Sequence, residues 1–103
     1  MKIIAGGLQP RPNKPLIRAL NNAHIWVQQM KTGTTIKQIA ATTSVSESYI
    51  TRVITLAFLS PRIQRAILAG TQPVDLTVET LVRRSIPRHW PDQEELYGIG
   101  SKS

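Results

Sequence analysis

The sequence predicts an all-α fold of five helices, with a short sixth left open, and three observations support this. Apolar residues recur three and four positions apart along most of the chain. Capping residues or prolines precede these stretches, and glycines follow several of them. No segment alternates apolar and polar residues, and no Asn-Gly or Asp-Gly hairpin turn is present. At 103 residues, the chain is expected to form one domain.

The first predicted helix begins after Asn13, a suitable N-cap, with Pro15 in its first turn. Lys31 falls in the last turn and Gly33 just after it, which favours an end there. The apolar stripe of this helix is expected to consist of Leu16, Leu20, Ala23, Val27 and Met30.

Two short helices are predicted next, separated by the break "TTSVS", which contains neither glycine nor proline. Thr34 or Thr35 caps a helix that runs to about Thr42. Ser46 caps a second helix that runs to about Ala57.

The later helices have clear start signals. Ser60 followed by Pro61 begins one that ends at Gly70, with Ile63, Ile67 and Leu68 as its apolar face. Thr77 begins another, with Val78, Leu81 and Val82 directed inward. Asp92 is expected to cap the short sixth helix, which runs up to Tyr97.

The charge distribution favours a polyanionic partner. Thirteen Lys and Arg against six Asp and Glu give a net charge of +7, and no acid precedes Glu47. Such a basic body favours nucleic acid, although a basic protein without such a partner remains an alternative. The chain has no cysteine and no apolar run of the roughly 20 residues that span a bilayer. We therefore expect no membrane association and a cytoplasmic protein, associated with the bacterial nucleoid.

The two short helices around "TTSVS" have the residue pattern of a helix-turn-helix. A small residue allows the helices to cross closely, and aliphatic residues face their junction. The positions that fit are Ala40, Val45, Ser46, Ile50 and Val53. Ser44 stands where the usual turn has glycine, so the serine must adopt a strained angle or the turn must differ. The alternative is an ordinary corner between two helices.

The outward face of the second helix supplies the candidate DNA contacts, because that helix enters the major groove in this motif. Arg52 is suited to bidentate pairing with guanine. The groups expected to meet bases or phosphates from this helix are Ser46, Ser48, Tyr49, Thr51, Arg52 and Thr55. Thr35, Lys37 and Gln38 are expected to position the backbone. For each residue, a solvated helix face is the alternative.

The residues after this helix, "LAFLSPRIQRAILAGTQPVDLT", extend the pattern. Together with Ser46, Tyr49 and Arg52, they resemble DNA-binding regions attached to serine-family site-specific recombinases of mobile elements. The chain is similar, more distantly, to the helix-turn-helix domain of ParB-type partition proteins. The resemblance covers about residues 16 to 98, including the ending "IPRHWPDQ". It implies DNA contacts at Ser46, Ser48, Tyr49 and Arg52, and a core that includes residues 56–59 and 63–68.

No catalytic constellation is found, so we expect no enzyme, no metal and no cofactor. We expect no counterpart of the catalytic or nucleotide-binding domains that the resembled families carry. His24 and His89 are far apart in the sequence. The acids Asp92, Glu94 and Glu95 are better explained as a solvated cluster than as acid–base groups.

The sequence therefore predicts sequence-specific binding of double-stranded DNA by residues 15–98, with a flexible basic arm at 1–14 and a tail at 99–103. The protein is expected to be a transcriptional regulator or a recombination accessory factor of a mobile element. It is expected to act as a homodimer or as several copies on DNA, with Trp90 and Tyr97 in the contact. The alternative is a non-enzymatic protein-interaction adaptor with a basic face.

Overall fold

The described residues form an all-helical fold, which confirms the predicted class. The computed structural model describes residues 11–74, 76–83 and 86–98 and places no strand among them. The α-helices are α1 (Lys14–Lys31), α2 (Ile36–Thr43), α3 (Glu47–Ile54), α4 (Pro61–Ala69), α5 (Val78–Arg83) and α6 (Trp90–Tyr97), with a 3-10 helix, η2 (Thr55–Phe58), after α3. The short sixth helix, left open by the sequence, is therefore present.

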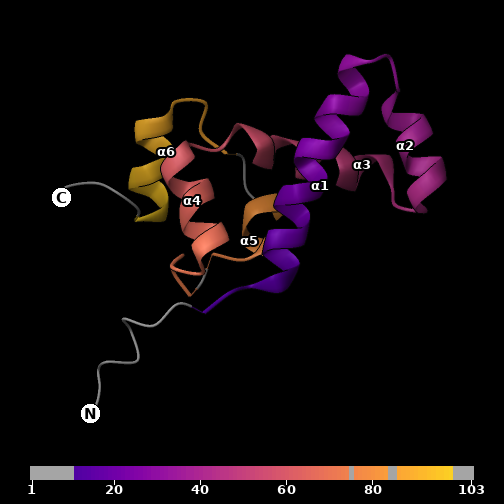
Figure 1. The fold of residues 1–103 in the computed structure, drawn as a ribbon. Helices are drawn as coiled ribbons and strands as arrows, with labels where there is room; N and C mark the ends of the chain where they lie inside the picture. Colours follow the sequence, from indigo (N-terminus) through magenta and orange to yellow (C-terminus); the bar gives the residue numbers. More distant parts are fainter. Residues whose placement is uncertain (1–10, 75, 84–85, 99–103) are drawn as a thin grey trace, which may run out of the picture.

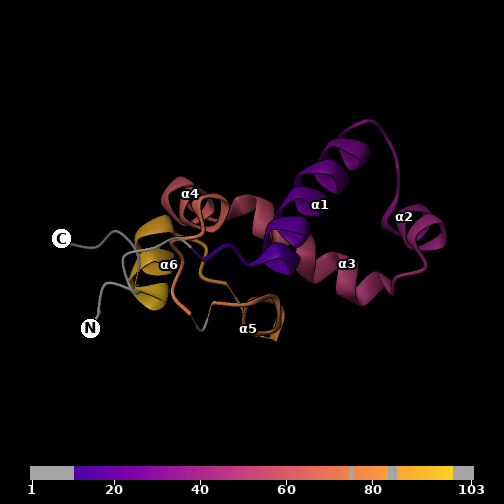
Figure 2. The same ribbon diagram turned by 60° about the horizontal axis from the view of Figure 1, so that its bottom comes forward.

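The long helix α1 connects two ends of the molecule (Figures 1 and 2). The α2–α3 pair lies at one end, and α4 and α6 lie side by side at the other. Helix α1 contacts α3, η2, α4 and α5, while α5 also contacts α3. The α2–α3 pair is thus mounted on α1, with α5 beside it.

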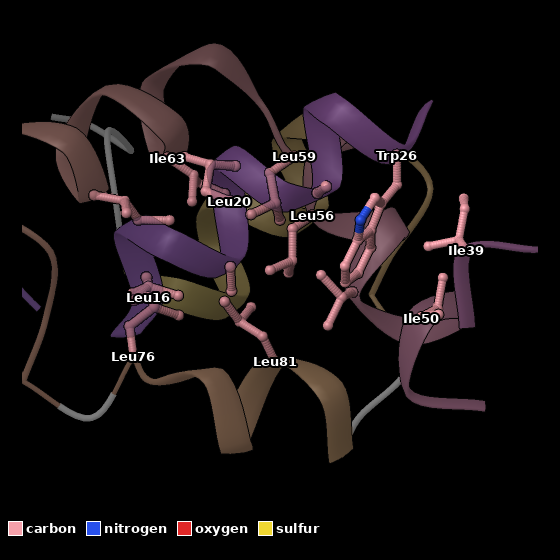
Figure 3. Close-up of a cluster of buried hydrophobic side chains, with 14 residues drawn as sticks. Leu16, Leu20, Trp26, Ile39, Ile50, Leu56, Leu59, Ile63, Leu76 and Leu81 are labelled. Atoms are coloured by element: carbon pink, nitrogen blue, oxygen red, sulfur yellow. The ribbon is translucent and has the colours of Figure 1, made fainter. Parts of the chain in front are cut away.

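One hydrophobic core runs along α1 (Figure 3). Leu16 and Leu20 face Leu56, Leu59 and side chains of α4 and α5. Toward the other end, Trp26 continues this core to Ile39 of α2 and Ile50 of α3. These side chains are buried, so removing their apolar surface from water stabilises both ends through a shared element.

Four predicted helix starts are confirmed by their cap hydrogen bonds. In each case a side-chain oxygen accepts from the backbone N–H three residues later, which satisfies a donor that the helix leaves unpaired. The capping residues are Asn13, Thr35, Ser46 and Ser60. Thr77 also accepts from Thr80 N at 3.2 Å, as expected for the start of α5.

Three expected core residues are exposed instead, and local geometry explains each case. On α1 the buried face passes through Ala19 and Trp26, so Val27 lies at its margin and Met30 is exposed. The 3-10 geometry of η2 places residues three apart on one face, which buries Leu56 and Leu59 but turns Phe58 outward. On α4, burial of Ile67 leaves its neighbour Leu68 exposed.

One predicted helix end and one predicted helix start differ from the structure. The helix from Ser46 ends as an α-helix at Ile54, and the chain continues to Phe58 as η2. The sixth helix begins at Trp90, with His89 in the N-cap position and no side-chain cap. Asp92 lies inside its first turn and is not the cap. Pro91 in that turn favours this earlier start, because its ring holds φ near the helical value.

Arg11 and Pro12 lie against the end of α4. The N–H of Arg11 donates to Gly70 O at 2.7 Å, and Gln72 Nε2 donates to Arg11 O at 3.2 Å. Gly70 has φ 77, and an added Cβ there would lie 2.9 Å from Pro12 N. Two features therefore favour glycine at position 70: the left-handed backbone angle and the close approach of the backbone at Pro12. Residues 1–10 and 99–103 of the predicted arm and tail lie outside the described residues.

Candidate nucleic-acid interface

The turn between α2 and α3 is closed by a serine in a left-handed conformation. Ser44 has φ 60 and ψ 30, and its N–H donates to Ala40 O at 2.9 Å. The serine therefore takes the backbone angle that glycine usually supplies, with an ordinary helix-ending hydrogen bond. Among the described residues it is the one non-glycine with positive φ.

The aliphatic residues that the sequence placed at the junction of α2 and α3 are buried or partly buried there. Ile39, Ile50 and Val53 are buried in the core. Ile36, Ala40 and Val45 are partly buried and pack against it. Burial of these faces directs the polar side of α3 away from α1 and α2.

The start of α2 is held by a reciprocal pair of hydrogen bonds. Thr35 Oγ1 accepts from Gln38 N at 3.1 Å, and Gln38 Oε1 accepts from Thr35 N at 2.9 Å. Both side chains were expected to position a DNA backbone. They also cap the helix, which leaves the Gln38 amide nitrogen and the Lys37 ammonium as available donors there.

Several hydroxyls on α3 are used within the helix itself. Ser46 Oγ accepts from Tyr49 N at 3.1 Å. Thr51 Oγ1 donates to Glu47 O at 2.9 Å, and Thr55 Oγ1 donates to Arg52 O at 2.6 Å. Each of these side chains is exposed, so the hydroxyl can turn to a new partner at the cost of a local bond.

Arg52 contacts α5, which the sequence did not predict. Its Nη1 donates to Val82 O at 2.7 Å. This carbonyl belongs to the last turn of α5, where backbone oxygens lack helical partners and carry partial negative charge. The guanidinium is therefore oriented by α5 while its other N–H groups remain on the exposed side of α3.

A hollow of about 450 Å³ opens between α3 and α5 at this contact. Its lining consists of Thr51, Arg52, Thr55, Leu81, Val82, Arg83 and Ile86. Two arginines and two threonines are thus among the lining residues, and no acidic residue is. The hollow is suited to an anion rather than to a cation.

Three of the nine predicted contact residues have no side-chain hydrogen bond to the described residues. They are Lys37, Ser48 and Tyr49, and Tyr49 is 39% exposed. The hollow brings together Thr51, Arg52 and Thr55 only. Thr35, Lys37 and Gln38 lie at the start of the neighbouring helix, and Ser46 at the start of α3.

Arg83 is the residue that sequence reasoning missed. It ends α5 and lines the same hollow as Arg52. The adjacent arginines at positions 83 and 84 were the available signal, since a basic pair at the end of a helix points to a polyanion contact. The sequence does not indicate which other helix Arg83 would lie near.

Other chemistries find little support in the described part of the chain. No group of three or more His, Asp or Glu side chains there is arranged to hold a metal ion. His24 Nε2 lies 2.7 Å from Gln64 Oε1, so this histidine is a helix-to-helix contact between α1 and α4. No described helix combines the length and the apolar character needed to cross a membrane.

Comparisons with known proteins identified no similar protein. No protein-family model matches this chain, and neither the curated proteins nor the solved structures contain a significant match.

Proposed function

We propose that this protein binds double-stranded DNA in a sequence-specific manner through the α2–α3 pair. The observation that carries the proposal is the exposed polar face of α3, presented by a tight turn and bordered by Arg52 and Arg83. A helix presented in this way fits the major groove, where side chains can reach base edges.

The residues of this face divide by chemistry. Ser48, Tyr49 and Thr51 offer hydroxyls to bases or phosphates, and Arg52 offers a guanidinium to guanine. Lys37 on α2 offers a point charge to the phosphate backbone. Glu47, the one acid on this pair of helices, sits in the first turn of α3 and stabilises the helix N-terminus.

A homodimer is the proposed binding unit, because one such helix reads few base pairs. Phe58 and Trp90 supply the apolar surface for it, being 60% and 51% exposed. Trp90 Nε1 donates to Phe58 O at 3.2 Å, which places the two residues together. Tyr97, also expected in this contact, is partly buried and packs against the core. A role as regulator or recombination accessory factor of a mobile element follows from the resemblance in sequence.

The test is selection of bound sites from random duplexes, followed by affinity measurements at several salt concentrations. An enriched palindrome is expected, with log K falling by about 0.9 per phosphate neutralised as log salt rises. Absence of binding to any duplex at low salt would overturn the proposal and favour the protein-interaction adaptor. Binding without sequence enrichment would overturn its specificity.

A further inference from the structure

The hollow between α3 and α5 is lined by two arginines, and no acidic residue among its lining residues balances their charge. Arg52 and Arg83 both line it, and two cations in one concavity repel each other. Arg52 is partly compensated by the Val82 carbonyl at 2.7 Å. Among the described residues, Arg83 has no hydrogen-bond or ion-pair partner. An anion entering the hollow would relieve this repulsion and use the free donors of Arg83.

The position of the hollow indicates which anion. Thr51 and Arg52 belong to the exposed face of α3, and Thr55 directly follows that helix at the start of η2. The hollow therefore opens along the side of α3. A helix in the major groove has a phosphate backbone along each side. Figure 2 shows α5 next to α3 in this region, so a DNA strand passing α3 there would also meet the end of α5.

We propose that the hollow is a phosphate subsite, in which Arg83 donates to one phosphodiester of the bound DNA. The planar guanidinium can donate two parallel N–H bonds to two phosphate oxygens. Arg52, held by Val82 O, adds its positive field to the same hollow. Helix α5 thereby becomes part of the interface. Val82 orients Arg52, and Arg83 fixes the register of the protein on the DNA backbone.

This inference rests on the proposed DNA binding. The variant R83A tests the phosphate subsite, and R65A is its matched control. Arg65 is exposed on α4 and does not line the hollow, so both variants lose one exposed guanidinium. R83A is expected to weaken binding to all duplexes by about three- to tenfold at about 0.1 M salt, and to reduce the salt slope by about 0.9. R65A is expected to leave the slope unchanged. Equal slopes for the two variants would overturn the subsite.

Neutral phosphate substitutions locate the contact. Replacing single phosphates by methylphosphonates removes one charge of the backbone at a time. At one position per half-site, the replacement should weaken the wild type but leave R83A unaffected, because the contact is already lost. A loss of the same size in both proteins at every position would contradict the assignment.

A second readout separates failure of the subsite from failure of the proposed function. Titration with inorganic phosphate, at constant ionic strength set by chloride, should shift the Arg83 Nε–H resonance and the Thr51 and Thr55 amides. R83A should lose the shifts at Thr51 and Thr55. If the wild type binds no duplex, the proposed function fails, and these resonances alone decide the subsite. Unmoved resonances would overturn it.

Discussion

Gln93 of α6 accepts a 2.7 Å hydrogen bond at Oε1 from the backbone N–H of Ser60, the N-cap of α4. Its Nε2 donates to Pro87 O at 2.8 Å. Both Gln93 and Ser60 are almost fully buried, with 2% and 0% exposure. One amide therefore satisfies the buried N–H of Ser60 and the part-buried carbonyl of Pro87, and it ties α6 to the start of α4.

Gln93→Leu is expected to lower the free energy of unfolding by about 1–3 kcal/mol, because it leaves the buried Ser60 N–H without a partner and removes the donor to the part-buried Pro87 carbonyl. Denaturant titration measures this change. Glu95→Gln on the exposed side of the same helix is the matched control and should change stability by less than about 0.5 kcal/mol. A Gln93→Leu protein as stable as the control would show that this bridge contributes nothing.

Ser44→Gly should raise the free energy of unfolding by about 1 kcal/mol, because glycine adopts the left-handed angle without the steric cost of a Cβ. Ser44→Ala removes the hydroxyl but keeps the Cβ, so it should bring no gain. Thermal unfolding at one pH compares the three proteins. Equal gains for glycine and alanine would mean that the hydroxyl, and not the backbone angle, is the source of strain.

Arg52→Ala should have two effects. Loss of the bond to Val82 O should lower stability by about 0.5–1 kcal/mol, a small value because the pair is exposed to solvent. It should also relax sequence preference at one base pair, worth about 1–3 kcal/mol of discrimination. Competition between the selected site and its single-base variants measures the second effect.

Arg52→Lys is the informative companion, because it keeps the charge and loses the planar fork. It should retain the salt slope of the wild type while losing the same base preference as the alanine variant. Full preference in the lysine variant would rule out bidentate reading by Arg52.

Lys37→Ala should weaken binding to the selected site and to unrelated duplexes by the same factor, because a phosphate contact carries no base information. The salt slope should fall by about 0.9. Arg18→Ala on α1 is the control for loss of one exposed charge. A Lys37→Ala protein that loses affinity for the selected site alone would point to a base contact instead.

The sequence by itself determined the starts of α1 to α5 and the composition of most of the core. Caps such as Asn13 and Ser60 act within four residues, so their effect is readable locally. The buried aliphatic residues of α2 and α3 follow from their spacing, for the same reason. The serine in place of glycine at position 44 was likewise readable as a choice between strain and a different turn, and the structure shows the left-handed angle.

Only the tertiary structure decided which elements meet. The bond from Arg52 to Val82 spans 30 residues, and that from Gln93 to Ser60 spans 33. No local pattern specifies such pairs, because they depend on how α1 holds α5 against α3 and on how α6 packs beside α4. The hollow that both Arg52 and Arg83 line arises from the same packing, and for this reason the sequence did not indicate Arg83.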